Sequence, residues 1–137
     1  MVLTHFLICA IVISLRDIQY HRIRRVHIYL ALLTLLPAID KTGVQFAVLN
    51  TFLYLAIYWA SDRQMGFGDV RLAALIGAYC GIWFSDLSDL LWANLFTWVL
   101  ASAMVMSGFV SGKVTFSSQI AFAPHMFMGL WLVHYIQ

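Results

Sequence analysis

Apolar residues follow one another along this chain in long runs that short polar segments interrupt. A backbone exposed to lipid must satisfy its own hydrogen bonds, so each run is predicted to form a helix. Several runs are shorter than the roughly 20 residues that span a typical hydrocarbon core, and the first two can gain a turn from their polar flanks. The pattern predicts an all-α integral membrane protein, a bundle of six transmembrane helices that forms one domain over residues 1–137. The runs are residues 2–16, 26–39, 43–60, 70–84, 87–110 and 118–136.

The composition supports this class of protein. Apolar residues make up 63% of the chain and charged residues 10%, against about 45–50% and about 25% in soluble domains. The formal net charge of +2 is too small to indicate a nucleic-acid partner. Cys9 and Cys80 are isolated, and the sequence contains no CxxC and no HExxH. No metal site and no cofactor are therefore predicted.

The basic residues orient the predicted bundle. With six crossings and the N-terminus outside the cytoplasm, all basic residues except Lys41 fall in cytoplasmic loops. Basic residues favour the cytoplasmic side of a membrane. We therefore expect a multi-pass protein of the inner (cytoplasmic) membrane with both termini outside the cytoplasm. The residues on the cytoplasmic side are Arg16, Arg22, Arg24, Arg25, Arg63, Arg71 and Lys113.

Two of the six acidic residues stand where an apolar run meets water on this cytoplasmic side. Asp17 ends the first run, and Asp69 directly precedes the run 70–84. Ionisable groups at membrane depth are costly to keep and are candidates for function. Two carboxyl groups that can meet share a proton, because both cannot ionise cheaply. One can then act as a general base on water while the other donates a proton. Aspartyl proteases use two carboxyl groups in these two roles.

Two glycines precede the second aspartate. Gly66 and Gly68 provide backbone freedom without side-chain bulk, which allows a tight turn and the close approach of an extended peptide. Each signal also has a simpler explanation: Asp69 can be a helix N-cap, and Asp17 can be a solvated residue paired with Arg16. The remaining acidic residues are assigned to loops, namely Asp40, Asp62, Asp86 and Asp89.

At these residues the chain resembles the type IV prepilin peptidases, bacterial membrane aspartyl proteases that trim class III signal peptides. The family's Gly-x-Gly-Asp block, followed by a basic residue and Leu, matches GFGDVRL at residues 66–72. Its first catalytic aspartate precedes an Ile-Pro-Asn signature, and Asp17 matches it, with Ile23 at the Ile. Arg24 and Arg25 replace the usual Pro and Asn. A Pro-containing last segment resembles IAFAPH at residues 120–125, which makes Pro124 and His125 candidates for the border of the site.

The resemblance implies a membrane aspartyl endopeptidase with Asp17 and Asp69 as catalytic residues at the cytoplasmic face. Gly66 and Gly68 would form the supporting turn that the substrate approaches. The implied substrate is a prepilin or pseudopilin with a short basic leader, a Gly before the cut and a hydrophobic helix, and membrane lipids are the other expected partners. Longer members of the family also N-methylate the trimmed pilin through a domain with paired CxxC motifs. Since this sequence has none, cleavage without methylation is expected.

A different class of function stays open. Acidic residues inside a membrane also serve transport, so the chain could be a small transporter or scaffold subunit in which Asp17 and Asp69 relay protons or bind a cation. No repeated half and no discontinuous helix pair supports that alternative. An inactive homologue that assists pilus assembly is a further alternative. Cleavage of a prepilin that depends on both aspartates would distinguish the peptidase from these two alternatives. The sequence does not indicate an oligomeric state.

Overall fold

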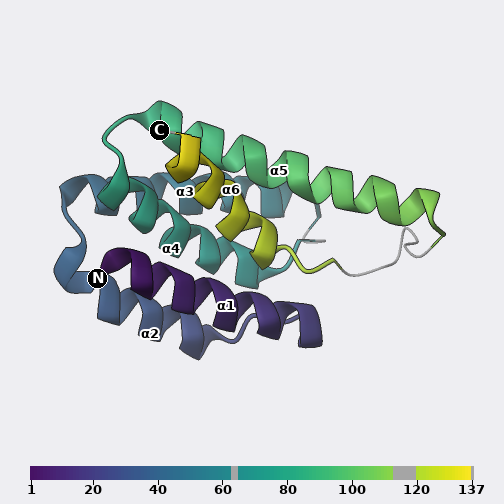
Figure 1. The fold of residues 1–137 in the computed structure, drawn as a ribbon, viewed down its shortest axis with the longest axis horizontal. Coiled ribbons are helices and arrows are strands. Elements are labelled where there is room, and N and C mark those ends of the chain that lie inside the picture. Colours follow the sequence, from purple (N-terminus) through teal and green to yellow (C-terminus); the bar gives the residue numbers. More distant parts are fainter. Residues whose placement is uncertain (63–64, 113–119, 137) are drawn as a thin grey trace.

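The computed structural model describes residues 1–62, 65–112 and 120–136, and these residues form a bundle of α-helices without strands (Figure 1). The chain runs back and forth, so the N- and C-termini lie at the same end of the bundle, on the left in Figure 1. The six helices predicted from the apolar runs are confirmed. They are α1 (Val2–Tyr20), α2 (Arg25–Leu35), α3 (Lys41–Ala60), α4 (Phe67–Trp83), α5 (Leu87–Val110) and α6 (Ala123–Ile136), with a 3-10 turn, η1 (Leu36–Ala38), after α2.

Three of the helices in the described ranges, α1, α3 and α5, are long and apolar enough to cross a membrane by length and composition. The apolar segment Arg25–Ala38, made of α2 and η1, is shorter. Large apolar side chains such as Ile8, Phe52 and Met106 point outward and are exposed in the isolated chain. Apolar surface on this scale is typical of an integral membrane protein whose outer face contacts lipid.

Helix α4 is the central helix of the bundle (Figure 1), and ten of its residues are buried. Gly77 and Gly81 bring it close to α3, because a Cβ atom at Gly77 would overlap the backbone of Phe46 and one at Gly81 would lie 2.5 Å from the Cα of Gly43. Small residues four positions apart allow two helix backbones to approach in this way. This packing holds the second half of α4 against the first half of α3.

Two buried asparagines connect three helices. The Asn50 side chain of α3 donates a hydrogen bond to the carbonyl of Ala73 on α4, with an N–O distance of 2.9 Å. Asn94 of α5 donates to the side-chain oxygen of Asn50, also at 2.9 Å. Hydrogen bonds between side chains and neighbouring helices stabilise membrane bundles, where water cannot replace them. The asparagines therefore hold α3, α4 and α5 in register.

Two helix ends differ from the predicted runs. Helix α1 continues to Tyr20, and His21 then takes a left-handed conformation with a φ of 47° and donates its N–H to the carbonyl of Asp17 at 2.8 Å. Asp17 is thus inside the last turn of α1. Helix α6 begins only at Ala123, because Pro124 has no N–H and its ring opposes a helical turn before it. Of the predicted run 118–136, residues 118 and 119 lie outside the described residues.

The predicted loop positions of the other four aspartates are only partly confirmed. Asp40 is the N-cap of α3 and accepts a hydrogen bond from the N–H of Gly43 at 2.7 Å, and Asp86 is the N-cap residue of α5. Asp62 is exposed, as expected. The prediction for Asp89 is wrong, because Asp89 lies in the first turn of α5 and is only 6% exposed. The amino end of a helix favours a negative charge, which explains why an acid is accepted there.

Candidate functional site

Asp17 points into the bundle from the last turn of α1, and its side chain is only 5% exposed. One carboxylate oxygen, Oδ2, accepts a hydrogen bond from the backbone N–H of Ala123 at an N–O distance of 2.9 Å. Ala123 is the first residue of α6, where N–H groups lack partners within the helix and the helix dipole favours an anion. The alternative of a solvated residue paired with Arg16 is therefore wrong. The Asp17 carboxylate instead accepts a hydrogen bond from a free N–H group at the amino end of α6.

Asp69 lies in the first turn of α4, three residues after the N-cap residue Gly66, and is half-buried. Its N–H donates to the carbonyl of Gly66 at 3.0 Å, and its carboxylate receives a hydrogen bond from the Gly66 backbone. An acid three residues after the N-cap that reaches back in this way stabilises the helix start. Asp69 is not the N-cap residue itself. It precedes the apolar run 70–84 and so lies outside the segment expected in the hydrocarbon.

The two carboxyl groups influence each other. Burial, and to a smaller extent the negative charge of Asp17, raise the pKa of Asp69 to about 7, while the hydrogen bond from the Gly66 backbone acts in the opposite direction. Asp17, in the last turn of α1, and Asp69, in the first turn of α4, are therefore near enough to interact electrostatically. These two helix turns lie at one end of the bundle, on the right in Figure 1. Burial and a neighbouring negative charge both disfavour the ionised form of a carboxyl group, so Asp69 keeps its proton to a higher pH than an exposed aspartate does. We call Asp17 and Asp69 the aspartate pair.

The two glycines before Asp69 have different neighbours. A Cβ atom at Gly68 would lie 3.1 Å from the Cβ of Ile23, in the connection between α1 and α2. A Cβ atom at Gly66 would meet the Oδ2 atom of Asp69 at 3.3 Å. Gly68 therefore allows the α1–α2 connection to pack on the start of α4, and Gly66, which is exposed, leaves room beside the carboxylate.

A tyrosine that the sequence analysis missed lies beside the aspartate pair. Tyr54 of α3 is fully buried, and its hydroxyl has no hydrogen-bond partner among the described residues. The hydroxyl interacts electrostatically with Asp69, and the tyrosine ring lies 6.3 Å from the ring of Phe122, measured between centroids. Phe122 directly precedes Ala123, the partner of Asp17. A buried hydroxyl without a partner is uncommon, and the only signal in the sequence was a tyrosine within the apolar run 43–60.

The block at residues 120–125 reaches the aspartate pair through its backbone. Pro124 follows Ala123 in the first turn of α6, so the proline helps to fix where the helix starts. His125 is buried, and its Nδ1 atom lies 3.1 Å from the carbonyl of Ala121. Among the described residues no hydrogen bond joins His125 to either aspartate. The contribution of this block to the site is therefore the backbone N–H of Ala123, which binds Asp17. Every residue except proline has such a group, so the sequence could not single it out.

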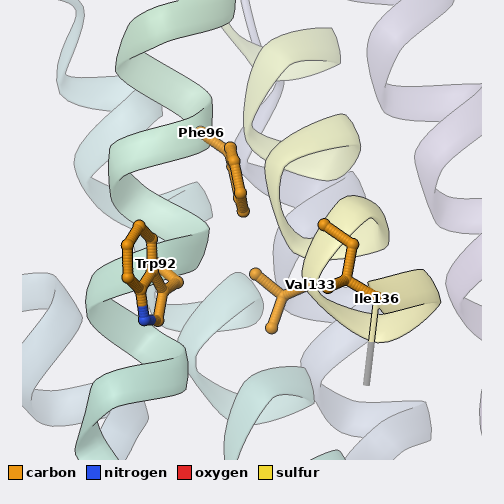
Figure 2. Close-up of a pocket in the computed structure, with 4 residues that line it drawn as sticks. All are labelled: Trp92, Phe96, Val133 and Ile136. Carbon is orange, nitrogen blue, oxygen red and sulfur yellow. The ribbon is translucent and has the colours of Figure 1, made fainter.

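The hollow drawn in Figure 2 lies elsewhere in the bundle. It has a volume of about 240 Å³ between α5 and α6 and is lined by Trp92, Phe96, Val133 and Ile136. Ile136 ends α6, whereas Ala123 begins it, so this hollow is at the far end from the aspartate pair. None of its four lining residues is ionisable. Within the three described ranges no group of three or more His, Cys, Asp or Glu side chains could hold a metal ion.

Comparison with known protein families gives a match. A family model described as the type IV leader peptidase family matches residues 4–112 of the 137-residue chain. The matched segment contains Asp17, the Gly66–Asp69 turn and all of helices α2 to α5, and it ends before α6. Searches of curated proteins and of solved structures returned no match.

Proposed function

Since this chain belongs to the type IV leader peptidase family, we propose that it is a membrane aspartyl endopeptidase that cleaves the leader of prepilin-like substrates. Asp17 and Asp69 are the catalytic residues of this proposal. The observation that carries it is the electrostatic coupling of these two carboxyl groups, which come from different helices and meet at one end of the bundle. The proposal covers cleavage alone, because Cys9 and Cys80 do not form a CxxC.

The proposed mechanism gives each carboxyl group a different first role. Asp17, as a carboxylate held by the N–H of Ala123, takes a proton from a water molecule whose oxygen attacks the carbonyl carbon of the scissile peptide. Asp69, whose raised pKa keeps it protonated near neutral pH, donates its proton to the carbonyl oxygen. The resulting diol loses a proton to Asp69 as the C–N bond breaks, and Asp17 returns its proton to the leaving nitrogen. Both residues then have their starting protonation states.

The proposed membrane arrangement has six crossings, with both termini outside the cytoplasm and the aspartate pair at the cytoplasmic face of the inner membrane. Support comes from the arginines that lie at the same end of the bundle as the pair, including Arg16, which adjoins Asp17, and Arg71 on α4. Basic residues favour the cytoplasmic side. Arg63 and Lys113, which belong to the same charge count, lie outside the described residues.

The proposed substrate fits this arrangement. A prepilin has a cytoplasmic leader followed by a hydrophobic helix, so the helix can lie against the apolar outer face of the bundle while the scissile bond reaches the cytoplasmic edge. Gly66 is exposed beside the Asp69 carboxylate. An extended peptide segment can therefore approach Asp69 without meeting a side chain at this position.

The test is to co-express the chain with a panel of prepilins and to determine the N-terminus of each product by mass spectrometry. We expect one cut, directly after the Gly that precedes the hydrophobic helix, and no cut in a prepilin in which that Gly is replaced by Val. If no prepilin is cut while the chain is present and folded in the membrane, the proposal fails and the transporter or inactive-homologue alternatives gain support.

A further inference from the structure

Basic side chains surround one hollow of about 530 Å³ next to the aspartate pair. The hollow lies between the end of α1, the α1–α2 connection, the start of α2 and α4. Five of its eight lining residues are arginines, and the other three present ring or aliphatic surface. The lining residues are Arg16, Tyr20, Arg22, Ile23, Arg24, Arg25, Val26 and Arg71. We call this site the arginine hollow.

The charges in the arginine hollow are not neutralised by any carboxylate among the described residues. Arg16 lies over the ring of Tyr20, with its guanidinium carbon 5.6 Å from the ring centre, and Arg71 lies 4.7 Å from the ring centre of Phe67. In the part of the chain that the structure describes, no ion pair joins any of the five arginines to a carboxylate. Asp17 adjoins Arg16 but turns inward to Ala123. Five uncompensated positive charges repel one another, so an anion from outside the protein would stabilise the hollow.

The chemistry of the lining selects the kind of anion. Guanidinium groups bind phosphate oxygens with two parallel hydrogen bonds, which favours a phosphate over a halide or a single carboxylate. The apolar members of the lining, Tyr20 and Val26, are each 62% exposed, and Ile23 lies between them in sequence. Free inorganic phosphate offers nothing for this surface to contact, whereas a phospholipid has a glycerol and acyl region directly below its phosphate.

We propose that the arginine hollow binds the phosphate headgroup of an anionic membrane lipid. Its position at the predicted cytoplasmic edge places it at headgroup depth, where basic residues are attracted to an anionic membrane surface. The hollow also adjoins the start of α4, where Asp69 lies. Ile23 lines it and packs on Gly68, which directly precedes Asp69. A bound lipid therefore holds the α1–α2 connection against the start of α4.

A consequence for cleavage rests on the proposed function. A basic leader and five arginines beside the aspartate pair repel each other, and a lipid phosphate in the hollow lowers that repulsion. Cleavage should accordingly be faster in membranes that contain anionic lipid. The binding itself requires no substrate, so it is tested separately from cleavage.

The test uses the purified full chain in a zwitterionic detergent and measures the shift of its melting temperature with added lipid. The probes are dioctanoyl phosphatidylglycerol, dioctanoyl phosphatidylcholine and inorganic phosphate. We expect the phosphatidylglycerol to raise the melting temperature at concentrations at least tenfold below those at which the other two act. An equal effect of phosphatidylcholine, or of inorganic phosphate, would overturn the proposal of an anionic lipid.

Variants locate the site. Arg24→Gln/Arg25→Gln should weaken the apparent affinity for phosphatidylglycerol roughly tenfold or more, since it removes charge-assisted hydrogen bonds to the phosphate. Arg24→Lys/Arg25→Lys keeps the charge but not the two parallel hydrogen bonds, so it should fall between that variant and wild type. Lys41→Gln is the matched control, because Lys41 begins α3 at the other end of the bundle. Wild-type affinity in the double glutamine variant, or an equal loss in Lys41→Gln, would contradict the assignment.

Discussion

The backbone N–H of Ala123 donates a hydrogen bond to the carboxylate of Asp17 at 2.9 Å, although the two residues are 106 positions apart in the sequence. This contact joins the last turn of the first helix to the first turn of the last helix. It gives the buried carboxylate of Asp17 a hydrogen-bond donor. It also brings the start of α6, which lies outside the family match at residues 4–112, next to the aspartate pair. The carboxyl-terminal helix is thereby part of the candidate site.

Removing this donor should impair cleavage. Ala123→Pro deletes the N–H at a helix position where proline is well accepted, and the preceding Phe122 is already outside the helix. Because hydrogen bonds to charged groups contribute about 1.5–3 kcal/mol, we expect the rate of prepilin cleavage to fall roughly 10- to 100-fold. Ala123→Ser keeps the N–H and is the control, measured at equal protein level in the membrane. Equal rates in the two variants would show that the contact does not support catalysis.

The raised pKa of Asp69 predicts how stability depends on pH. In the folded chain Asp69 keeps its proton up to about pH 7, whereas in the unfolded chain it releases it near its ordinary value of 3.8. The folded state therefore binds more protons between these values, and the free energy of unfolding contributed by Asp69 decreases as the pH rises from about 4 to 7. Melting temperatures measured across this range should decline less steeply in Asp69→Asn than in wild type.

The same experiment separates the two causes of the raised pKa. Asp17→Asn removes the charge that adds to the effect of burial, so the pH at which the decline ends should move below 7 but stay above 3.8. An unchanged end point in Asp17→Asn would mean that the two carboxyl groups do not interact. A slope in Asp69→Asn identical to that of wild type would mean that Asp69 is not the group that titrates.

Side-chain bulk at Gly68 should impair cleavage in proportion to its size. A Cβ atom at this position would lie 3.1 Å from the Cβ of Ile23, which is tighter than ordinary van der Waals contact, so the α1–α2 connection must shift. We expect cleavage to fall in Gly68→Ala and to fall further in Gly68→Leu, with both proteins still inserted and folded. Circular dichroism and membrane levels check the fold. Full activity in Gly68→Leu would reject a role for this glycine.

The buried hydroxyl of Tyr54 gives a prediction about stability. Because the hydroxyl has no partner among the described residues, Tyr54→Phe removes a polar atom whose burial costs about 1–3 kcal/mol when it is unsatisfied. The melting temperature of Tyr54→Phe should therefore be no lower than that of wild type. Asn94→Leu is the comparison variant: it breaks the buried hydrogen bond to Asn50, so its melting temperature should be lower than that of wild type. A marked fall in the melting temperature of Tyr54→Phe would show that the hydroxyl has a partner in the membrane.

The sequence predicts most of the bundle because its signals are local. The run 43–60 became α3 at Lys41–Ala60 and the run 87–110 became α5 at Leu87–Val110, since apolar runs bounded by polar residues determine helices in lipid. Helix α1 continues past Asp17 and ends only where His21 takes a left-handed conformation, which is unusual for a residue other than glycine and which the sequence therefore did not predict.

The contacts that shape the candidate site have no local signal. The approach of Ala123 to Asp17, of Ile23 to Gly68 and of the Tyr54 hydroxyl to Asp69 depends on which helices pack together. One packing feature was visible in the sequence. Gly77 and Gly81 form a GxxxG pair, and that spacing is typical of close helix approach in membranes.

The central claim is that Asp17 and Asp69 together cleave a prepilin, and substitution of each by Asn tests it most directly. Asn keeps the size of the side chain but cannot carry the proton or the charge. Asp62→Asn is the matched control, because Asp62 is exposed and has a φ of 50°, a conformation that Asn also accepts. We expect a co-expressed prepilin to be processed by wild type and Asp62→Asn and to remain uncut with Asp17→Asn or Asp69→Asn at equal membrane levels. Processing at the wild-type rate by either of these two variants would contradict the account.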